Sequence, residues 1–252
     1  ENKLFAMSGA KTSYTTDGAN WTTSNTDFPA ITTSYTAITF MEKLFIIGGV
    51  QNPLTNAIVT GNVYSTRSEP ITCNTSGSLV CSVDSLTMVA SFAVGGASSA
   101  YSTALNKAYI FGGSTNTFTN GIFEFNPTTQ HVVQKSNLPV PVTQSSAVYF
   151  PPNGQIYVAG GINHIASNNT PASTSITGYD PVTNLITSTA QLPSGRASAS
   201  SVFCPENNKI YILGGNLFSG SDFSDEIIEY DPTSGNVVTK TEKLPFGLAN
   251  SP

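Results

Sequence analysis

The strongest constraint on the fold is a short apolar segment that ends in two glycines and recurs along the chain. It reads MEKLFIIGG at 41–49, LNKAYIFGG at 105–113, NGQIYVAGG at 153–161 and NNKIYILGG at 207–215, with a degenerate copy, ENKLFAMSG, at 1–9. A period of roughly 50 residues indicates one small structural unit repeated several times. Such units bury their apolar faces only by packing against each other, so the repeat predicts a modular fold.

An aromatic residue follows each copy, and a large apolar residue stands seven positions after it. The five pairs are Tyr14 and Trp21, Tyr64 and Ile71, Phe125 and Val132, Tyr179 and Ile186, and Tyr230 and Val237. We expect the two members of a pair to lie on neighbouring strands and to pack between adjacent units. The connection after Ile71 is longer than the others, which predicts an insertion there, because repeat arrays tolerate insertions in single connections.

Each unit reads as four short antiparallel strands. A small-residue strand such as SSAVYF (145–150) precedes the apolar strand, and an aromatic strand and an outer strand follow it; turn dipeptides such as Asn-Gly at 153–154 separate them. We expect close backbone approach and positive φ at the paired glycines, which are Gly48, Gly49, Gly112, Gly113, Gly160, Gly161, Gly214 and Gly215. The sequence therefore predicts an all-β, single-domain β-propeller over 1–252, with four-stranded blades at approximately 1–30, 31–92, 93–141, 142–194 and 195–252.

The pattern resembles the kelch repeat, whose marks are an apolar run ending in Gly-Gly, a later Tyr and a Trp at a fixed interval. Tyr14 with Trp21 is the full aromatic pair, whereas the other units carry Ile or Val in place of Trp, and Phe125 replaces Tyr. The resemblance covers nearly the whole chain and implies a propeller. Since kelch propellers commonly have six or seven blades, the five units either close a ring with one shortened inner strand or belong to a larger ring.

Composition limits the partners. Only 10% of the residues are charged, against about a quarter in a typical soluble protein, while 31 serines and 32 threonines are present. A net charge of −5 without a cluster of Lys or Arg argues against nucleic acid as a ligand. The sequence has no apolar run of the roughly 18 residues that a transmembrane helix needs, so we expect no membrane span.

Several features favour a secreted or cell-surface protein. N-glycosylation sequons begin at Asn20, Asn74 and Asn168, and Cys73 and Cys81 are spaced for a disulfide within the insertion. The first residue is Glu1, so either a leader has been removed or the sequence is a piece of a longer one. Cys204 is expected to fill a buried apolar position.

Candidate binding residues lie in the loops after the glycines. These loops offer Asn163, His164, Asn216, Phe218 and Asp222 as a recognition surface. Arg196 stands where many kelch proteins carry a ligand-facing arginine, but Val142 and Leu248 occupy that position in other units. Arg196 is therefore expected either to contact an acidic partner or to make a structural hydrogen bond to a neighbouring blade.

No residue set predicts a cofactor, a metal or a catalytic centre. His131 and His164 fall at opposite ends of the strands, which argues against the paired-His copper site of galactose oxidase-like propellers. The acidic residues Asp222, Asp225, Glu226 and Glu229 are expected to be mainly solvated rather than bound to Ca²⁺.

The sequence thus predicts an extracellular, non-catalytic propeller that recognises protein or glycan through loops on one face. A variant is a subunit of a surface assembly or fibre, because a shortened inner strand could accept a strand from a neighbour. The alternative is a carbohydrate-active enzyme of the mutarotase or lyase type, which would use carboxylates near the channel. A pocket in which two carboxylates converge on one ligand would favour the enzyme over the binding protein.

Overall fold

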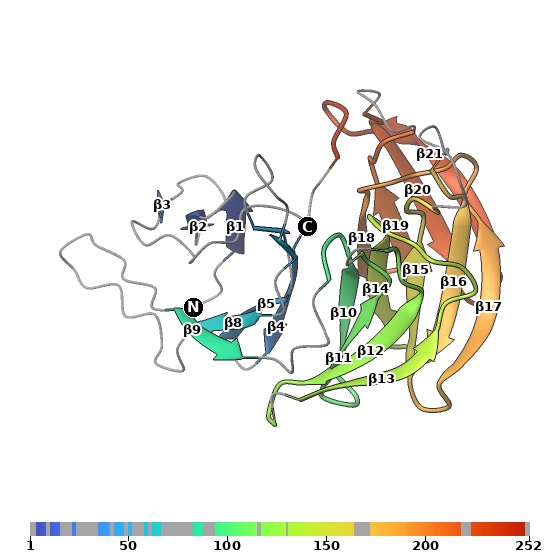
Figure 1. The fold of residues 1–252 in the computed structure, drawn as a ribbon. Helices are drawn as coiled ribbons and strands as arrows, with labels where there is room; N and C mark the ends of the chain where they lie inside the picture. Colours follow the sequence, from blue (N-terminus) through green and yellow to red (C-terminus); the bar gives the residue numbers. More distant parts are fainter. Residues whose placement is uncertain are drawn as a thin grey trace. The chain divides into compact units, whose positions relative to one another are not determined.

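The computed structural model describes residues 4–8, 11–15, 22–23, 35–40, 43–47, 50–51, 58–59, 62–66, 83–87, 94–114, 117–129, 131–163, 172–217 and 223–249. The chain divides into two compact units, Glu1–Gly95 and Gly96–Pro252. All regular elements within the described ranges are β-strands (Figure 1), which confirms the all-β prediction. None of these segments forms an apolar helix of membrane-spanning length.

The first unit contains one three-stranded and one four-stranded antiparallel sheet. The three-stranded sheet has the order β1 (Leu4–Ser8), β2 (Lys11–Thr15), β3 (Thr22–Thr23). The four-stranded sheet has the order β4 (Thr36–Phe40), β5 (Lys43–Ile47), β8 (Asn62–Thr66), β9 (Val83–Thr87). β6 (Val50–Gln51) and β7 (Ile58–Val59) form a small hairpin after the apolar strand β5.

The second unit consists of three four-stranded antiparallel sheets (Figure 1). The first comprises β10 (Ser98–Ser102), β11 (Lys107–Phe111), β12 (Gly121–Asn126) and β13 (His131–Asn137). The second comprises β14 (Ser146–Phe150), β15 (Gln155–Ala159), β16 (Ser175–Asp180) and β17 (Leu185–Gln191). The third comprises β18 (Ser200–Cys204), β19 (Lys209–Leu213), β20 (Glu226–Asp231) and β21 (Asn236–Lys243). In each sheet the spatial order equals the chain order, as the four-strand pattern predicts.

Strand pairing in the second unit explains the interval of seven residues. Phe125 lies opposite Val132, Tyr179 opposite Ile186 and Tyr230 opposite Val237, across the third and fourth strands of the three sheets. Each interval is therefore the separation of two cross-strand partners joined by a tight turn. The prediction that these pairs occupy neighbouring strands is confirmed for this unit.

In the first unit the pairs themselves are not tested, because Trp21 and Ile71 lie outside the described residues, but the pairing of the aromatic residues differs from that of the second unit. Tyr64 lies opposite Ser85, because residues 67–82 intervene between β8 and β9. Tyr14 lies opposite Thr22, one position beyond the expected partner. The insertion thus precedes the outer strand of its sheet instead of following it, a placement that spacing alone does not reveal. Trp21, Ile71, Cys73 and Cys81 lie outside the described residues.

The paired glycines bind the chain segment that leads into the next sheet. The N–H groups of Gly113, Gly161 and Gly215 donate hydrogen bonds to the carbonyl oxygens of Val142, Arg196 and Leu248, at 2.8, 2.7 and 2.6 Å. At Gly160, φ is +68°, and a Cβ atom would lie 2.1 Å from the Arg196 oxygen. The expected close approach and positive φ are therefore confirmed at this position. Gly48 and Gly49 lie outside the described residues.

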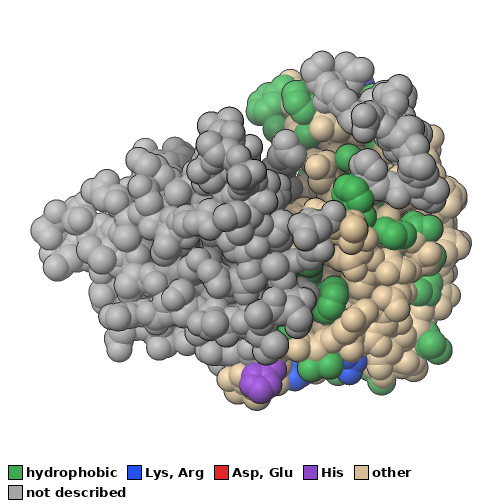
Figure 2. Space-filling model, in the orientation of Figure 1, with side chains coloured by type: hydrophobic (Ala, Val, Ile, Leu, Met, Phe, Trp, Pro, Cys, Tyr) green, Lys and Arg blue, Asp and Glu red, His purple; other side chains and the backbone are tan. Residues whose placement is uncertain are grey.

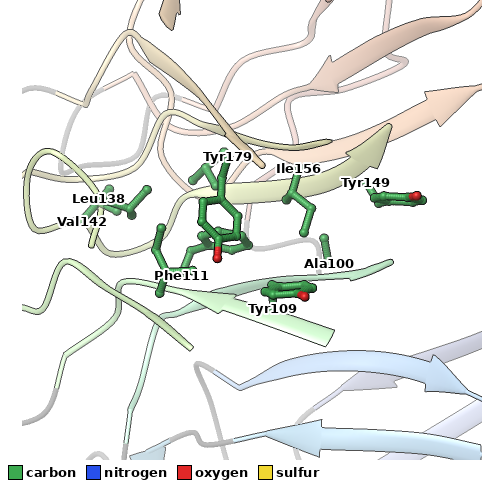
Figure 3. Packing of buried hydrophobic residues seen from close by; sticks show 10 residues of the cluster. Ala100, Tyr109, Phe111, Leu138, Val142, Tyr149, Ile156 and Tyr179 are labelled. Carbon is green, nitrogen blue, oxygen red and sulfur yellow. The ribbon is translucent and has the colours of Figure 1, made fainter. Parts of the chain in front are cut away.

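The core of the second unit lies between its sheets. β10 lies beside β14 and β14 beside β18, so the first strands of the three sheets are neighbours. Tyr179 packs edge-on against Tyr109 and Phe111 of the preceding sheet, with ring centroids 5.8 Å apart in both cases (Figure 3). The rings of Tyr230 and Tyr157 repeat this contact one sheet further along, at 5.4 Å. The aromatic position of the repeat therefore joins one sheet to the next, as predicted.

Candidate functional site

The candidate site is the set of loops at the glycine end of the three sheets in the second unit, here called the glycine-end loops. They comprise the described parts of 112–120, 160–174 and 214–225, together with the Leu-Pro segments 138–144, 192–198 and 244–249. Backbone hydrogen bonds join the two sets: Leu138 donates to Asn120, Leu192 to Thr174 and Leu244 to Asp225, at 2.7, 2.7 and 2.8 Å. The same hydrogen bond recurs in all three sheets of the second unit, so these loops together form one continuous face of that unit.

Arg196 is buried in this face and serves a structural contact. Its side chain forms an ion pair with Glu226 at the start of β20, and Nη1 donates to the Gly195 carbonyl at 3.2 Å. The backbone of Arg196 is hydrogen-bonded to Gly161 and Ser173 in the loops of the second sheet, whereas Glu226 belongs to the third sheet. Of the two expectations, the structure therefore has the structural contact between neighbouring units. Arg196 is only 1% exposed, so contact with an outside acidic partner would require rearrangement of the loop.

The electrostatics of this ion pair are dominated by burial. Burial lowers the pKa of the Arg196 guanidinium, while the charge of Glu226 and its hydrogen bond act in the opposite direction. The Nε atom of Arg196 is buried and has no hydrogen-bond partner among the described residues. Val142 takes the corresponding position in the preceding repeat and belongs to the apolar cluster between the first two sheets.

Asn216 and Asn163 occupy neighbouring loops of the face. Asn216 forms two backbone hydrogen bonds with Ala197, and Ile162, which precedes Asn163, forms the same pair with Thr143. Both asparagine side chains are partly buried, and the Oδ1 atom of Asn216 lacks a hydrogen-bond partner within the described structure. The structure therefore brings these two predicted residues to the same end of the sheets. His164, Phe218 and Asp222 lie outside the described residues.

Exposed phenylalanines on this face were missed by the sequence reasoning. Phe223 is 51% exposed and Phe246 is 64% exposed. They lie in adjoining loops, since a Cβ atom on Gly247 would be 2.4 Å from the Phe223 carbonyl oxygen. Phe118, which is 38% exposed, takes the position of Phe223 in the first sheet of this unit, whereas the second sheet has Ala172 there. The position of Phe246 is Val140 in the first sheet and Ser194 in the second, so Phe246 is the departure from the repeat. Comparing LPFG with LPSG could have revealed it.

Each described acidic residue near this face contacts different basic or hydroxyl side chains. Asp225 Oδ1 lies 2.9 Å from Lys243 Nζ, and this hydrogen bond lowers the pKa of Asp225. Glu229 accepts a hydrogen bond from Tyr211 at 2.8 Å and one from Lys240 at 3.2 Å. Together with the Glu226 ion pair, these contacts occupy the three described acids individually. Within the described ranges, no three His, Cys, Asp or Glu side chains group as metal ligands.

The remaining sequence candidates are placed as follows. His131 is the exposed first residue of β13. Cys204 is a free thiol at the end of β18 and is only partly buried, so the expectation of a buried filler is wrong; its Sγ donates to Glu206 Oε2 at 3.0 Å. Asn20, Asn74 and Asn168 lie outside the described residues. On the face seen in Figure 2, few charged side chains are visible among the described atoms, in keeping with the composition.

Comparisons with known proteins define the fold and nothing beyond it. No protein-family model matches the sequence, and no curated protein matches it. Among solved structures, the chain is similar to the one titled "Structure of YjhT", with a TM-score of 0.65 and 18% sequence identity. The similarity covers 88% of this chain and 68% of the YjhT chain. At this identity the similarity concerns the fold alone.

Proposed function

We propose that the five sheets are the blades of a kelch-type β-propeller that acts outside the cell as a non-catalytic binding protein. The recurring glycine-bound connection and the side-by-side first strands of the second unit support a propeller, as does the similar fold of YjhT. The kelch-like spacing of glycines, aromatic and apolar residues supports the family. The three sequons, the paired cysteines and the low content of charged residues support secretion.

The glycine-end loops are the proposed ligand surface, and the ligand is a protein or a glycan. The observation that carries this proposal is the pair of exposed rings of Phe223 and Phe246, with the partly buried Asn216 bridged to Phe223. Asn163 lies in the equivalent loop of the preceding sheet. Aromatic faces with adjacent amide groups suit both sugar rings and apolar side chains of a protein, because both need an apolar platform and hydrogen-bond partners. The individually paired acids favour binding over general acid–base catalysis.

A glycan array, run beside a pull-down from native extracellular material, tests the proposal. The binding variant carries Phe223→Ala with Phe246→Ser, which copies the residues of the second sheet at these positions. The control variant carries Leu185→Ser, because Leu185 is an exposed apolar residue on the outer strand β17. We expect the binding variant to lose at least about tenfold in affinity, the loss of ~1.4 kcal/mol, and the control to retain it. Equal binding by all three proteins would refute the loop surface.

A further inference from the structure

The residue two positions before the first strand of each sheet in the second unit has a left-handed backbone. These residues are Gly96 before β10, Gln144 before β14 and Ser198 before β18, with φ of +66°, +55° and +54°. Gln144 N–H donates a hydrogen bond to Gly96 O, and Ser198 N–H donates one to Gln144 O, both at 2.7 Å. These main-chain bonds recur from sheet to sheet, so the backbone takes the same course whatever the side chain is.

Glycine is the residue best suited to this position, but only one of the three sheets carries it. A left-handed backbone strains any residue that has a Cβ atom, whereas glycine adopts it freely. Gly96 shows that the fold accepts glycine here, and a Cβ atom added to Gly96 would have no neighbour closer than 3.7 Å. Gln144 and Ser198 therefore keep polar side chains at a cost to the backbone, and strain of this kind is concentrated at functional sites.

The two strained residues contact each other through their side chains. Ser198 is buried, and its Oγ atom donates a hydrogen bond to Oε1 of the exposed Gln144 at 3.2 Å. Because the amide oxygen is held by Ser198, the Nε2 group with its two N–H donors points away from Ser198. Within the described structure, no residue accepts a hydrogen bond from Nε2. Gln144 therefore presents an oriented donor group at the surface.

Gln144 and Ser198 belong to the glycine-end loops. Ala197, which precedes Ser198, is bridged to Asn216, and Asn216 is bridged to Phe223. Neighbouring strands lie about 4.8 Å apart, so the main chain of Phe223 lies roughly 10 Å from that of Ala197. The exposed ring of Phe223 and the donor group of Gln144 are thus parts of the same face of the second unit.

We propose that Gln144 is a specificity-determining residue of this face, whose Nε2 group donates hydrogen bonds to the oxygen atoms of a neutral glycan. Ser198 is a positioning residue, because it holds the amide of Gln144 in the donating orientation. The inference rests on the binding surface proposed above, and it names the class of ligand that this surface takes. The strain at the two positions is retained because glycine, which would relieve it, offers no donor to the ligand.

The charges beside this face favour a neutral ligand. Asp225 is paired with Lys243, and Glu226 is paired with the buried Arg196. A charged ligand would have to compete with these partners, whereas sugar oxygens accept hydrogen bonds from an uncharged amide without such competition. The apolar face of a sugar ring also packs on an aromatic side chain. A neutral glycan therefore uses both the donor group and the exposed rings.

The test is an array of cello-, malto- and chito-oligosaccharides, together with oligosaccharides that contain uronic acids, probed with the whole protein. We expect the tightest binding to a neutral oligosaccharide, with a Kd on the order of 100 μM when it is titrated in solution. Gln144→Gly removes both N–H donors and should weaken this binding at least about tenfold. Ser198→Gly leaves the donors in place without their orientation and should weaken it about threefold.

Two further variants distinguish a donor from a merely structural side chain. Gln144→Glu keeps an oxygen that accepts from Ser198 but has no N–H donor, so it should bind as weakly as Gln144→Gly. Normal binding by Gln144→Glu would overturn the inference. Asn208→Gly is the matched control, since Asn208 is exposed, has φ of +54° and lies in the turn between β18 and β19, at the other end of the strands. This variant should bind like the unsubstituted protein.

Urea unfolding provides a second readout that needs no ligand. Glycine relieves the left-handed strain, and this relief offsets the side-chain hydrogen bond that is lost. We therefore expect the midpoint of Gln144→Gly to stay within about 0.3 M of that of the unsubstituted protein, although its binding is lost. A fall of more than about 0.5 M would show that the side chain serves the fold, and it would overturn the inference.

The remaining outcomes separate this inference from the proposed function. If an oligosaccharide binds and the variant Phe223→Ala with Phe246→Ser weakens its binding but Gln144→Gly does not, the surface stands and the role of Gln144 is refuted. Preference for the oligosaccharides with uronic acids, or binding of a protein from the pull-down and of no oligosaccharide, would refute the neutral glycan while leaving a binding surface. Binding of neither an oligosaccharide nor a protein would refute both proposals.

Discussion

Replacing Gly160 with alanine tests whether the paired glycines hold the repeat together. The added Cβ would lie 2.1 Å from the carbonyl oxygen of Arg196, while real Cβ contacts are rarely under 3.0 Å. The segment entering the next sheet must therefore move by about 0.9 Å or more. That movement breaks the 2.7 Å hydrogen bond between Gly161 N–H and Arg196 O, which lies in a buried part of the face. A buried carbonyl without its donor costs about 1–3 kcal/mol.

Gly154 provides the matched control for this substitution. Its φ is +73°, close to the +68° of Gly160, but no atom lies within 4 Å of an added Cβ. Both alanine variants therefore carry the strain of a left-handed backbone, about 1 kcal/mol, and only Gly160→Ala carries the clash. We expect the free energy of unfolding to fall by about 1 kcal/mol for Gly154→Ala and by about 3 kcal/mol for Gly160→Ala.

Urea titrations followed by circular dichroism measure this difference. With an m-value of about 2 kcal/mol/M, a gap of ~2 kcal/mol separates the two midpoints by about 1 M. Gly112→Ala should behave like Gly160→Ala, since its added Cβ would also lie 2.1 Å from a carbonyl oxygen, that of Val142. Midpoints of Gly154→Ala and Gly160→Ala within about 0.2 M of each other would show that the glycine does not bind the connection.

Three further outcomes are expected. Glu226→Gln should lower the free energy of unfolding by about 2 kcal/mol in the same urea assay, because it leaves the buried Arg196 without an opposite charge. The loss should be smaller than for a fully buried ion pair, since the Glu226 side chain is partly exposed. The hydrogen bond from Lys209 holds the pKa of Asp231 below its usual range, so the Asp231 carboxylate stabilises the fold above about pH 4, and this stabilisation is lost as the pH falls. Asp231→Asn should therefore make the urea midpoint fall less between about pH 5 and pH 2 than it does in the unsubstituted protein. Mass spectrometry after alkylation should find Cys73 and Cys81 protected until a reductant is added, and alkylation of all cysteines without reductant would exclude the disulfide.

The repeat made the local structure of the second unit predictable. Spacing of turns and apolar residues gave the four strands of each sheet in their correct order, because antiparallel strands joined by short turns pair with their sequence neighbours. The seven-residue interval between Tyr179 and Ile186 was readable because a tight turn leaves one register for the two strands. Between β8 and β9 the connection is longer, and Tyr64 lies opposite Ser85, 21 positions on, so the interval of seven residues does not predict its cross-strand partner.

The environment of individual side chains in the loops could not be predicted in the same way. Arg196 was a candidate ligand residue because it stands where many kelch proteins carry a ligand-facing arginine. Its partner, Glu226, is 30 residues away and stood in an acidic cluster that was expected to be solvated. Only the backbone bonds that fold residues 192–198 against the glycines bring the two charges together, and such pairing has no local sequence signal. Phe246 is different, because comparing LPFG at 244–247 with LPSG at 192–195 does show a departure from the repeat.

The contrast between Val142, Arg196 and Leu248 explains why the sequence predicts the fold but not the ligand. In all three repeats the carbonyl of this residue accepts a hydrogen bond from the second glycine, so the main chain has the same course whatever the side chain is. Val142 joins an apolar cluster, Arg196 forms a buried ion pair, and Leu248 is only partly covered. A position fixed by its backbone can change its side chain at little cost to the fold. A residue that departs from the repeat, such as Phe246, is therefore where a ligand specific to this protein would be recognised. Its substitution should change binding without changing the midpoint of unfolding.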